Sequence, residues 1–246
     1  MHDFTQHCWQ MLSHSALDQL LKTTLLEDVQ TIGDLTCQAL VSETARGMAR
    51  ITTRINGTLA GVAIIPKILS LVDEHLVWEG ELDDAAEFAS GDIIGMIRGP
   101  ARGLLIAERP VLNFLGRLSG IATLTKRYVD AVRGTNAQIY DTRKTTPGWR
   151  QLEKYAVVCG GGRNHRSGLY DAVLIKDNHL ALCRQEEKAL SAAEAVVRAK
   201  EFLRERFADI SPIVEVEVDT LEQFREVLPT GPDIVLLDNM TLEQLS

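Results

Sequence analysis

The sequence predicts an α/β protein in two parts, a small α+β unit over about the first 100 residues and then a series of parallel β-α units. In the second half, short apolar runs alternate with helical stretches, and this alternation is typical of parallel β-α units. The first half mixes helical spacing with β-type runs in no such repeat. The apolar runs expected as strands are AQIY, DAVLI, PIVEVEV and DIVLL, at residues 137–140, 171–175, 212–218 and 233–237.

The chain opens with a predicted amphipathic helix and a predicted hairpin. Ser15 is a suitable N-cap for a helix in which four leucines recur at helical spacing. Two β-type runs, residues 49–55 and 58–65, flank Asn56-Gly57, which is a strong local signal for a tight hairpin. The four leucines are Leu17, Leu20, Leu21 and Leu25.

Three further elements are expected before residue 133. Pro66 is predicted to stand at the first position of a helix, and residues 91–99 read as a strand. Residues 102–132 have helical spacing, but Pro110 removes a backbone donor and should kink the helix or begin a new one. This places Arg109 at the break.

Composition limits the classes of function. A hydrophobic fraction of 45% over 246 residues supplies an ordinary core. The net charge of −8 argues against a nucleic-acid binder, which needs an extended basic face. No apolar run approaches the roughly 20 residues of a membrane span, so no membrane partner is expected. The four cysteines include no C-x-x-C pair, so they read as reduced thiols of a cytoplasmic protein.

One glycine-rich segment is cationic although the chain is acidic. Residues 143–176 hold seven Lys or Arg residues against two acids, which indicates a small, multiply charged anionic ligand. The simpler interpretation, solvated surface charge, is preferred for Arg150, Lys154 and Arg163. The other cations are Arg143, Lys144, Arg166 and Lys176.

Charged residues follow the predicted strands where each strand ends. Arg143 and Lys144 come soon after residues 137–140, Lys176 follows residues 171–175, and Asp238 follows residues 233–237. Ligands of parallel β-α folds bind at this edge of the sheet. Within the third predicted strand, Glu215 and Glu217 share one face, because side chains alternate with a period of two.

Cations and carboxylates at one edge have a joint chemical explanation. Arg and Lys bind carboxylate or phosphate oxygens, and Asp and Glu hold a divalent metal that can bind a polyphosphate. The predicted ligands are therefore a phosphorylated, metal-chelating substrate and an acidic co-substrate.

Several motifs together resemble the quinolinate phosphoribosyltransferases, also called carboxylating nicotinate-nucleotide pyrophosphorylases. They are DTRKTTPG and GGGRNHRSGLYDAVLIKDNH in the middle, EDVQTIGDLT and ERPVLN before them, and EVEVDTLEQ and LLDNM after them. The resemblance implies an N-terminal α+β open sandwich domain at residues 1–118. It implies a C-terminal open α/β barrel at residues 119–246, expected to be incomplete because such proteins continue past LLDNM.

The resemblance also implies an activity. Quinolinate and 5-phosphoribosyl 1-pyrophosphate, with Mg²⁺, would give nicotinate mononucleotide, pyrophosphate and CO₂ in de novo NAD biosynthesis. The enzyme would be a cytoplasmic homodimer or a higher even homo-oligomer with shared active sites, and neither nucleic acid nor membrane would be a partner.

Site residues follow from the resemblance position by position. Arg143, His165, Arg166 and Lys176 match residues around the quinolinate carboxylates, and Lys144 matches one that meets the phosphoribosyl donor. Arg109 matches an arginine that reaches the neighbouring subunit's site. Glu217 and Asp238 match acidic residues near the metal and ribose, and Glu215 is a further candidate. Catalytic roles are expected for Lys144, Lys176, Glu217 and Asp238.

Three alternatives stay open from the residues alone. Lys176 could form a Schiff base, as in aldolase-type enzymes. The chain could instead be a related pyrophosphorylase-like protein of molybdate-transport context, or a non-catalytic anion-binding descendant of the enzyme. The role of His179 is undecided.

Overall fold

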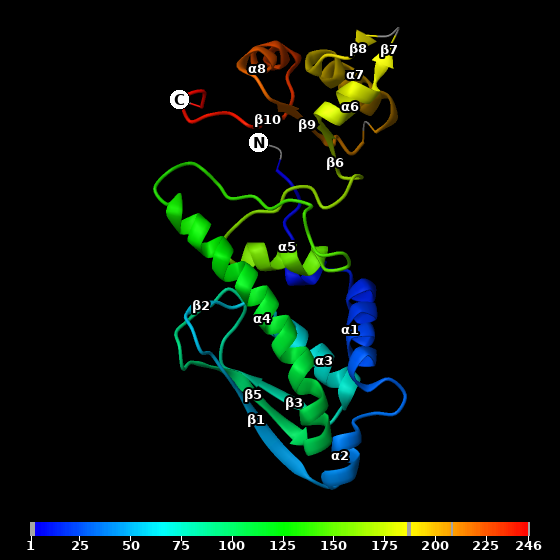
Figure 1. Ribbon diagram of the computed structural model, residues 1–246, viewed down its shortest axis with the longest axis vertical. Helices are drawn as coiled ribbons and strands as arrows, with labels where there is room; N and C mark the ends of the chain where they lie inside the picture. Colours follow the sequence, from blue (N-terminus) through cyan, green and yellow to red (C-terminus); the bar gives the residue numbers. More distant parts are fainter. Residues whose placement is uncertain (1–2, 186–187, 208, 246) are drawn as a thin grey trace. The chain divides into compact units, whose positions relative to one another are not determined.

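The computed structural model describes residues 3–185, 188–207 and 209–245. The chain divides into two compact units, both visible in Figure 1. One is residues 6–165, and the other joins the N-terminal five residues to the segment from Arg166 onwards. The predicted domain boundary between residues 118 and 119 stays a prediction.

The unit of residues 6–165 combines an antiparallel sheet with helices (Figure 1). Its elements in chain order are η1 (Trp9–Met11), α1 (His14–Val29), α2 (Leu35–Leu40), β1 (Arg46–Thr52), β2 (Gly57–Thr58), η2 (Val62–Ile64), α3 (Ile65–Val72), β3 (Val77–Gly80), β4 (Glu87–Phe88), β5 (Ile93–Pro100), α4 (Ala101–Ala131) and α5 (Arg150–Cys159). The main sheet has the order β1-β5-β3, and α3 and α4 pack against it. Between them lies a core that includes Ile68, Val111, Phe114 and Leu118, each at most 1% exposed.

The predicted hairpin at Asn56-Gly57 is wrong. Strand β1 pairs with β5, and β2 pairs with β4 instead of β1. The physical reason is a competing partner on α4. The Thr58 N–H donates to Thr123 Oγ1 (2.9 Å), and the Ala60 N–H donates to Ser119 Oγ (3.1 Å). These hydroxyls take the backbone donors that a hairpin would have used.

Predictions for the helices of this unit were right in part. Pro66 does stand in the first turn of α3, and β5 covers the strand expected at residues 91–99. The first helix is capped by Ser13 instead of Ser15. The predicted break at Pro110 is also wrong, because α4 runs through it without interruption. Pro110 is buried among other α4 side chains that pack on the sheet, and this burial offsets the missing backbone donor.

The second unit contains three parallel strands in the order β10-β9-β6. Its elements are β6 (Ala172–Ile175), α6 (Asp177–Leu182), β7 (Arg184–Gln185), β8 (Lys188–Ala189), α7 (Ala192–Arg206), β9 (Ile213–Val218), α8 (Leu221–Val227), η3 (Leu228–Thr230) and β10 (Ile234–Leu237). Helix α7 begins with a capping box, in which Ser191 Oγ accepts from the Glu194 N–H and Glu194 Oε2 accepts from the Ser191 N–H. The parallel β-α pattern predicted for residues 171–237 is confirmed.

The first predicted strand of the second half is not a strand. Residues 137–140 form one isolated parallel bridge, Tyr140 to Arg163. Two hydrogen bonds make up this bridge: the Arg163 N–H donates to the Ile139 carbonyl (2.8 Å), and the Asp141 N–H donates to the Arg163 carbonyl (3.0 Å). The segment is extended and paired, but too briefly to form a strand.

The two faces of the β10-β9-β6 sheet differ in chemistry. Ile175, Val216 and Val218 share one face and join a core with residues of α7 and α8. The strand register places Leu174 beside Glu215, and Glu217 beside Leu236, on the other face. An apolar cluster of Phe4, Ala172, Ile213 and Ile234 closes the amino end of that face. The charged side chains of this face therefore lie toward its carboxyl end.

Among the described residues, no helix has both the length and the apolar character needed to cross a membrane.

Candidate functional site

Arg143 and Lys144 lie on a loop between the Tyr140 bridge and α5. The loop is held by its own hydrogen bonds: the Lys144 N–H donates to Thr142 Oγ1 (3.0 Å), and the Thr145 N–H donates to the Arg143 carbonyl (2.9 Å). Lys144 is exposed and Arg143 is half-buried. The Arg143 Nε atom is buried and has no hydrogen-bond partner among the described residues. A buried donor without a protein partner is what an anion-binding arginine presents before its ligand arrives.

A buried carboxylate fixes the far end of this loop. Glu153, on α5, accepts from the Thr146 N–H (3.2 Å) and from Arg117 Nε (3.1 Å). The Arg117 guanidinium also lies 5.5 Å from the centre of the Trp149 ring, and Trp149 stacks on Phe114. Burial raises the pKa of Glu153, but the hydrogen bonds from Arg117 and Thr146 outweigh it and hold the pKa below its ordinary value. Glu153 is therefore ionised at neutral pH and keeps the loop in place.

His165 lies on a second segment of the same unit, beside the loop of Arg143. Its backbone belongs to a buried set of groups named here the Asp141 network: the side chains of Asp141, Lys154 and Asn164 and the backbone of His165. Lys154 Nζ pairs with Asp141 Oδ1 and donates to the His165 carbonyl (2.8 Å). The His165 N–H donates to Asp141 Oδ1 (2.9 Å), and Asn164 Nδ2 donates to Asp141 Oδ2 (2.7 Å).

The Asp141 network corrects one prediction from the sequence. Lys154 was expected to be a solvated charge, but its side chain is fully buried and ion-paired. Arg150 and Arg163, given the same interpretation, are half-buried, and Arg150 Nε donates to Thr145 Oγ1 (3.1 Å). Asn164 was not predicted to have any role.

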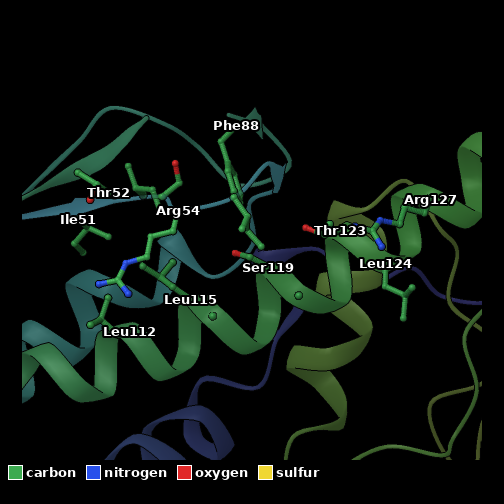
Figure 2. A pocket seen from close by; sticks show the side chains of 15 residues that line it. Ile51, Thr52, Arg54, Phe88, Leu112, Leu115, Ser119, Thr123, Leu124 and Arg127 are labelled. Carbon is green, nitrogen blue, oxygen red and sulfur yellow. The ribbon is translucent and has the colours of Figure 1, made fainter. Parts of the chain in front are cut away.

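Arg109 is exposed on α4 and lines a large groove between α4 and β1. The groove has a volume of about 1160 Å³, and Arg50, Arg54 and Glu108 also line it. A neighbouring groove of about 410 Å³ is more apolar; Figure 2 shows Phe88, Leu112 and Leu115 around it. The side chain of Arg54 lines both grooves. Arg109 is thus placed on an open surface of α4 and not in the loop region of Arg143.

In the second unit, Lys176 and Glu217 form an ion pair at the carboxyl end of the sheet. Lys176 directly follows β6, and its backbone N–H donates to His179 Nδ1 (2.9 Å). His179, whose role the sequence left undecided, therefore caps the start of α6. Arg166 is buried and donates to the Ala172 carbonyl (3.3 Å).

The acidic candidates lie on the polar face of the same sheet. Glu215 is 1% exposed, and Glu217 lies two residues further along the strand toward its carboxyl end, on the same face. Asp238 directly follows β10, where its N–H donates to the Val218 carbonyl (3.0 Å) and Asn239 Nδ2 donates to its carboxylate (3.0 Å). Because Leu236 is the register partner of Glu217, Asp238 lies two residues beyond that row on the same face.

The predicted site residues divide between the two units. Arg109, Arg143, Lys144 and His165 belong to residues 6–165, whereas Arg166, Lys176, Glu217 and Asp238 belong to the other unit. Within the first unit, the Asp141 network joins the segments that carry Arg143 and His165, and Arg109 lies elsewhere, on α4. Within the second, Lys176 and Glu217 are in contact, and Asp238 shares their edge of the sheet.

A magnesium ion would need oxygen ligands at this edge. No group of three or more His, Cys, Asp or Glu residues suited to a metal occurs in the part of the chain that the structure describes. Mg²⁺, however, is commonly bound through one or two carboxylates together with substrate phosphates and water. Glu217 and Asp238 supply such a pair, so the donor set fits a metal that arrives with a phosphorylated substrate.

The fold and these charged groups define a class, an α/β protein whose cations and carboxylates suit small anionic ligands. The comparisons with known proteins agree along the whole chain. Residues 34–119 match the N-terminal domain of quinolinate phosphoribosyl transferase, and residues 121–246 match the C-terminal domain. The chain belongs to the quinolinate phosphoribosyltransferase family, whose enzymes are pentosyltransferases.

Individual relatives show how far the similarity extends. A probable carboxylating nicotinate-nucleotide pyrophosphorylase of Bacillus subtilis is 43% identical over 93% of this chain and 74% of its own length. A mitochondrial decarboxylating quinolinate phosphoribosyltransferase of Nicotiana tabacum is 39% identical over 92% of this chain, which spans 63% of that relative. The solved nicotinate-nucleotide pyrophosphorylase of Francisella tularensis superposes with a TM-score of 0.87 at 34% identity, covering 99% of this chain and 80% of that one.

Proposed function

We propose that this chain converts quinolinate and 5-phosphoribosyl 1-pyrophosphate to nicotinate mononucleotide, pyrophosphate and CO₂ in de novo NAD biosynthesis. The observation that carries the proposal is the match of both family domains, together with relatives named for this activity. The charged groups suit both substrates, because one is a dianionic pyridine and the other carries a phosphate and a diphosphate. No comparison favours the molybdate-related alternative.

The cationic residues would bind the anionic groups of the substrates, and the acidic residues would bind the ribose and the metal. Arg143, His165, Arg166 and Lys176 would bind the two carboxylates of quinolinate, and Lys144 would meet the phosphoribosyl donor. The unpartnered Arg143 Nε supports this role. Glu217 and Asp238 would contact the ribose and hold Mg²⁺, which neutralises the diphosphate leaving group when bound.

The chain contributes positioning and electrostatics to the first step. The pyridine nitrogen of quinolinate attacks the anomeric carbon of the sugar, and the bond from that carbon to pyrophosphate breaks. Positive charge develops on the sugar as the leaving group departs. Carboxylates such as Glu217 would stabilise that charge, and Lys144 and Lys176 would stabilise the negative charges of the substrates.

Decarboxylation then follows from the chemistry of the product. Once alkylated, the ring is a pyridinium that can accept the electron pair released when the adjacent carbon–carboxylate bond breaks. CO₂ leaves, and a proton is added to the ring carbon. The protein would orient the leaving carboxylate and keep its cationic partners in place.

A dimer and a Mg²⁺ requirement complete the proposal. Arg109 is exposed in a groove with Arg50 and Arg54, and exposed Leu105 and Leu112 line the same groove. A second subunit would cover these side chains and receive Arg109 in its active site. The free state of all four cysteines suits a reducing cytoplasm. We also propose the open-sandwich and open-barrel descriptions for residues 1–118 and 119–246.

Isotope release tests the reaction directly. Quinolinate labelled in the carboxylate next to the ring nitrogen should release labelled CO₂ only when the phosphoribosyl donor and Mg²⁺ are both present. Arg143→Ala should abolish quinolinate binding, measured by calorimetry, and leave the circular dichroism spectrum unchanged. Arg133→Ala is the control, because this arginine is 74% exposed and pairs only with Asp130 among its described neighbours. Binding without any CO₂ release by the wild type would instead favour the anion-binding descendant.

A further inference from the structure

Lys154 is among the largest fully buried side chains of the molecule, although it carries a charge. Taking a lysine and its carboxylate partner out of water costs free energy that their mutual attraction only partly returns. An apolar pair of similar size would commonly stabilise a fold as well or better. Stability of the unit therefore does not explain why Lys154 and Asp141 are placed here, and their contacts have to be considered.

The Asp141 network holds both backbone polar groups of His165. Asp141 Oδ1 accepts the His165 N–H at 2.9 Å, and Lys154 Nζ donates to the His165 carbonyl at 2.8 Å. Asn164 completes the arrangement, because its Nδ2 donates to Asp141 Oδ2 (2.7 Å) and to the Lys154 carbonyl (2.9 Å). Its Oδ1 accepts the His7 N–H at 2.6 Å. Asn164 is 0% exposed, so its own side chain is sheltered from water.

The same network fixes a second segment of the chain. Asp141 lies two residues before Arg143 and three before Lys144. Its own N–H donates to the Arg163 carbonyl (3.0 Å), so both the backbone and the side chain of Asp141 are tied to residues 163–165. Two segments far apart in the sequence, one carrying Arg143 and Lys144 and the other carrying His165, are thus joined through a single carboxylate.

We propose that Lys154, with Asp141 and Asn164, is a positioning residue for the reaction: it sets His165 relative to Arg143 and Lys144, and does not itself contact substrate. This inference rests on the proposed function for its link to quinolinate, but the coupling of the two segments is independent of it. An ion pair suits the task because its hydrogen bonds are directional, whereas apolar packing would hold the segments less specifically.

The test is steady-state kinetics of Lys154→Met in the full chain, with Ile68→Ala as the matched control. Ile68 is 1% exposed in α3, so its truncation destabilises the same unit without touching the network. Partial unfolding removes active molecules, which lowers the apparent kcat and leaves KM unchanged. Misplaced binding groups raise KM for quinolinate, on the order of tenfold or more for a displacement of about 1 Å.

We expect Lys154→Met to raise KM for quinolinate and Ile68→Ala to leave it at the wild-type value at comparable loss of Tm. If both variants kept the wild-type KM and lost activity only in proportion to their folded fraction, the network would be structural and the proposal would be wrong.

If Lys154→Met alone does not fold, a double variant allows KM to be measured. In Lys154→Met with Asp141→Asn, no buried charge lacks its partner, so Tm should recover toward the wild-type value. The donor to the His165 carbonyl is still missing, so KM for quinolinate should stay raised. A double variant that recovered both Tm and KM would overturn the proposal.

Hydrogen exchange separates this inference from the proposed function. Peptides covering residues 139–144 and 163–165 should exchange faster in the Lys154 variants than in Ile68→Ala, whatever the wild type turns over. Unchanged exchange there would refute the coupling of the segments. Faster exchange in the Lys154 variants, together with a wild type that releases no CO₂, would refute the proposed function and leave the coupling intact.

Discussion

Lys176 and Glu217 meet as an ion pair at the carboxyl end of two neighbouring parallel strands. The register explains the contact: Ile175 is paired with Val216, and each of the two charged residues comes one position later. Both side chains therefore leave the sheet on the same face. With the Lys176 side chain 40% exposed and that of Glu217 15% exposed, the pair is open enough to exchange its partners for a ligand.

Glu217→Gln should impair activity far more than stability. A pair this exposed contributes less than about 1 kcal/mol to folding. Loss of a charge that stabilises the transition state costs on the order of 10²-fold in kcat or more. The measurement is kcat and KM for both substrates alongside Tm. Asp18→Asn is the control, because Asp18, whose side chain is 46% exposed, pairs with Lys67 outside the predicted site, and loss of this pair should leave kcat unchanged. Equal effects of the two variants would remove Glu217 from the site.

The aldolase-type alternative, a Schiff base at Lys176, predicts that a carbonyl compound becomes covalently attached to this lysine. The Lys176 side chain is held in an ion pair with Glu217, whereas a Schiff-base lysine must present a free amine to the carbonyl carbon. We expect no covalent adduct when the protein is treated with a carbonyl compound and borohydride, measured by mass spectrometry. A borohydride-trapped adduct at Lys176 would contradict the phosphoribosyl-transfer mechanism proposed here.

Glu153 should make the free energy of unfolding fall at acid pH. Its pKa is lower in the folded state than in the unfolded chain, so its stabilising effect is complete above the unfolded value, about 4.3. The effect is lost as pH falls through the folded value. Hydrogen bonds to a charged group contribute about 1.5–3 kcal/mol each, and Glu153→Gln should lose a comparable amount at pH 7.

The measurement is the free energy of unfolding of wild type and Glu153→Gln between pH 7 and pH 3. The difference between them should be constant down to about pH 5 and shrink below it. A difference that stayed constant over the whole range would mean that the charge of Glu153 is not what stabilises the loop.

Local sequence patterns predicted the elements that depend on local interactions. The apolar runs at residues 172–175, 213–218 and 234–237 form parallel strands, as continuous apolar runs between helices predict, and one face of their sheet packs on α7 and α8. The predicted positions of Lys176 and Asp238 followed from the ends of those strands, and that of Glu217 followed from side-chain alternation within its strand. The sequence could therefore indicate the polar edge of this sheet before any coordinates.

Two of the failures involve partners that are distant in the chain. Ser119 and Thr123 lie about 60 positions from the backbone donors that they satisfy, so the Asn-Gly pair alone could not exclude a hairpin. Lys154 reads as a surface lysine because its partners Asp141 and Asn164 belong to other segments. One signal was available: Lys154 lies on α5 among Leu152, Tyr155 and Ala156, and a charge within such an apolar run needs a buried partner.

The four cysteines should fall into two reactivity classes. Burial and the nearby Asp84 carboxylate raise the pKa of the Cys159 thiol to about 11, and a hydrogen bond with Asp34 raises the pKa of Cys37. Both thiols are buried, whereas Cys8 and Cys183 are exposed. Because the thiolate is the reactive form, a chromogenic disulfide reagent at pH 8 should label Cys8 and Cys183 quickly and the other two only after denaturation. Rapid labelling of all four in the native protein would contradict the described packing.

Ser119→Ala should destabilise the unit of residues 6–165, because it removes the hydrogen bonds that hold the backbone of Ala60 against α4. Ser119 Oγ accepts the Ala60 N–H and donates to the Ala60 carbonyl, and Ala60 is 0% exposed. Alanine would leave both backbone groups buried without a partner, at a cost of about 1–3 kcal/mol. Denaturant unfolding measures this cost, with Ser70→Ala as the control, because Ser70 is exposed and its hydroxyl donates only within α3 among the described residues. Ser119 lies outside the predicted site, so KM for both substrates should stay at the wild-type value. Equal stability of the Ser119→Ala and Ser70→Ala variants would show that the Ser119 hydroxyl is not what holds residues 58–60.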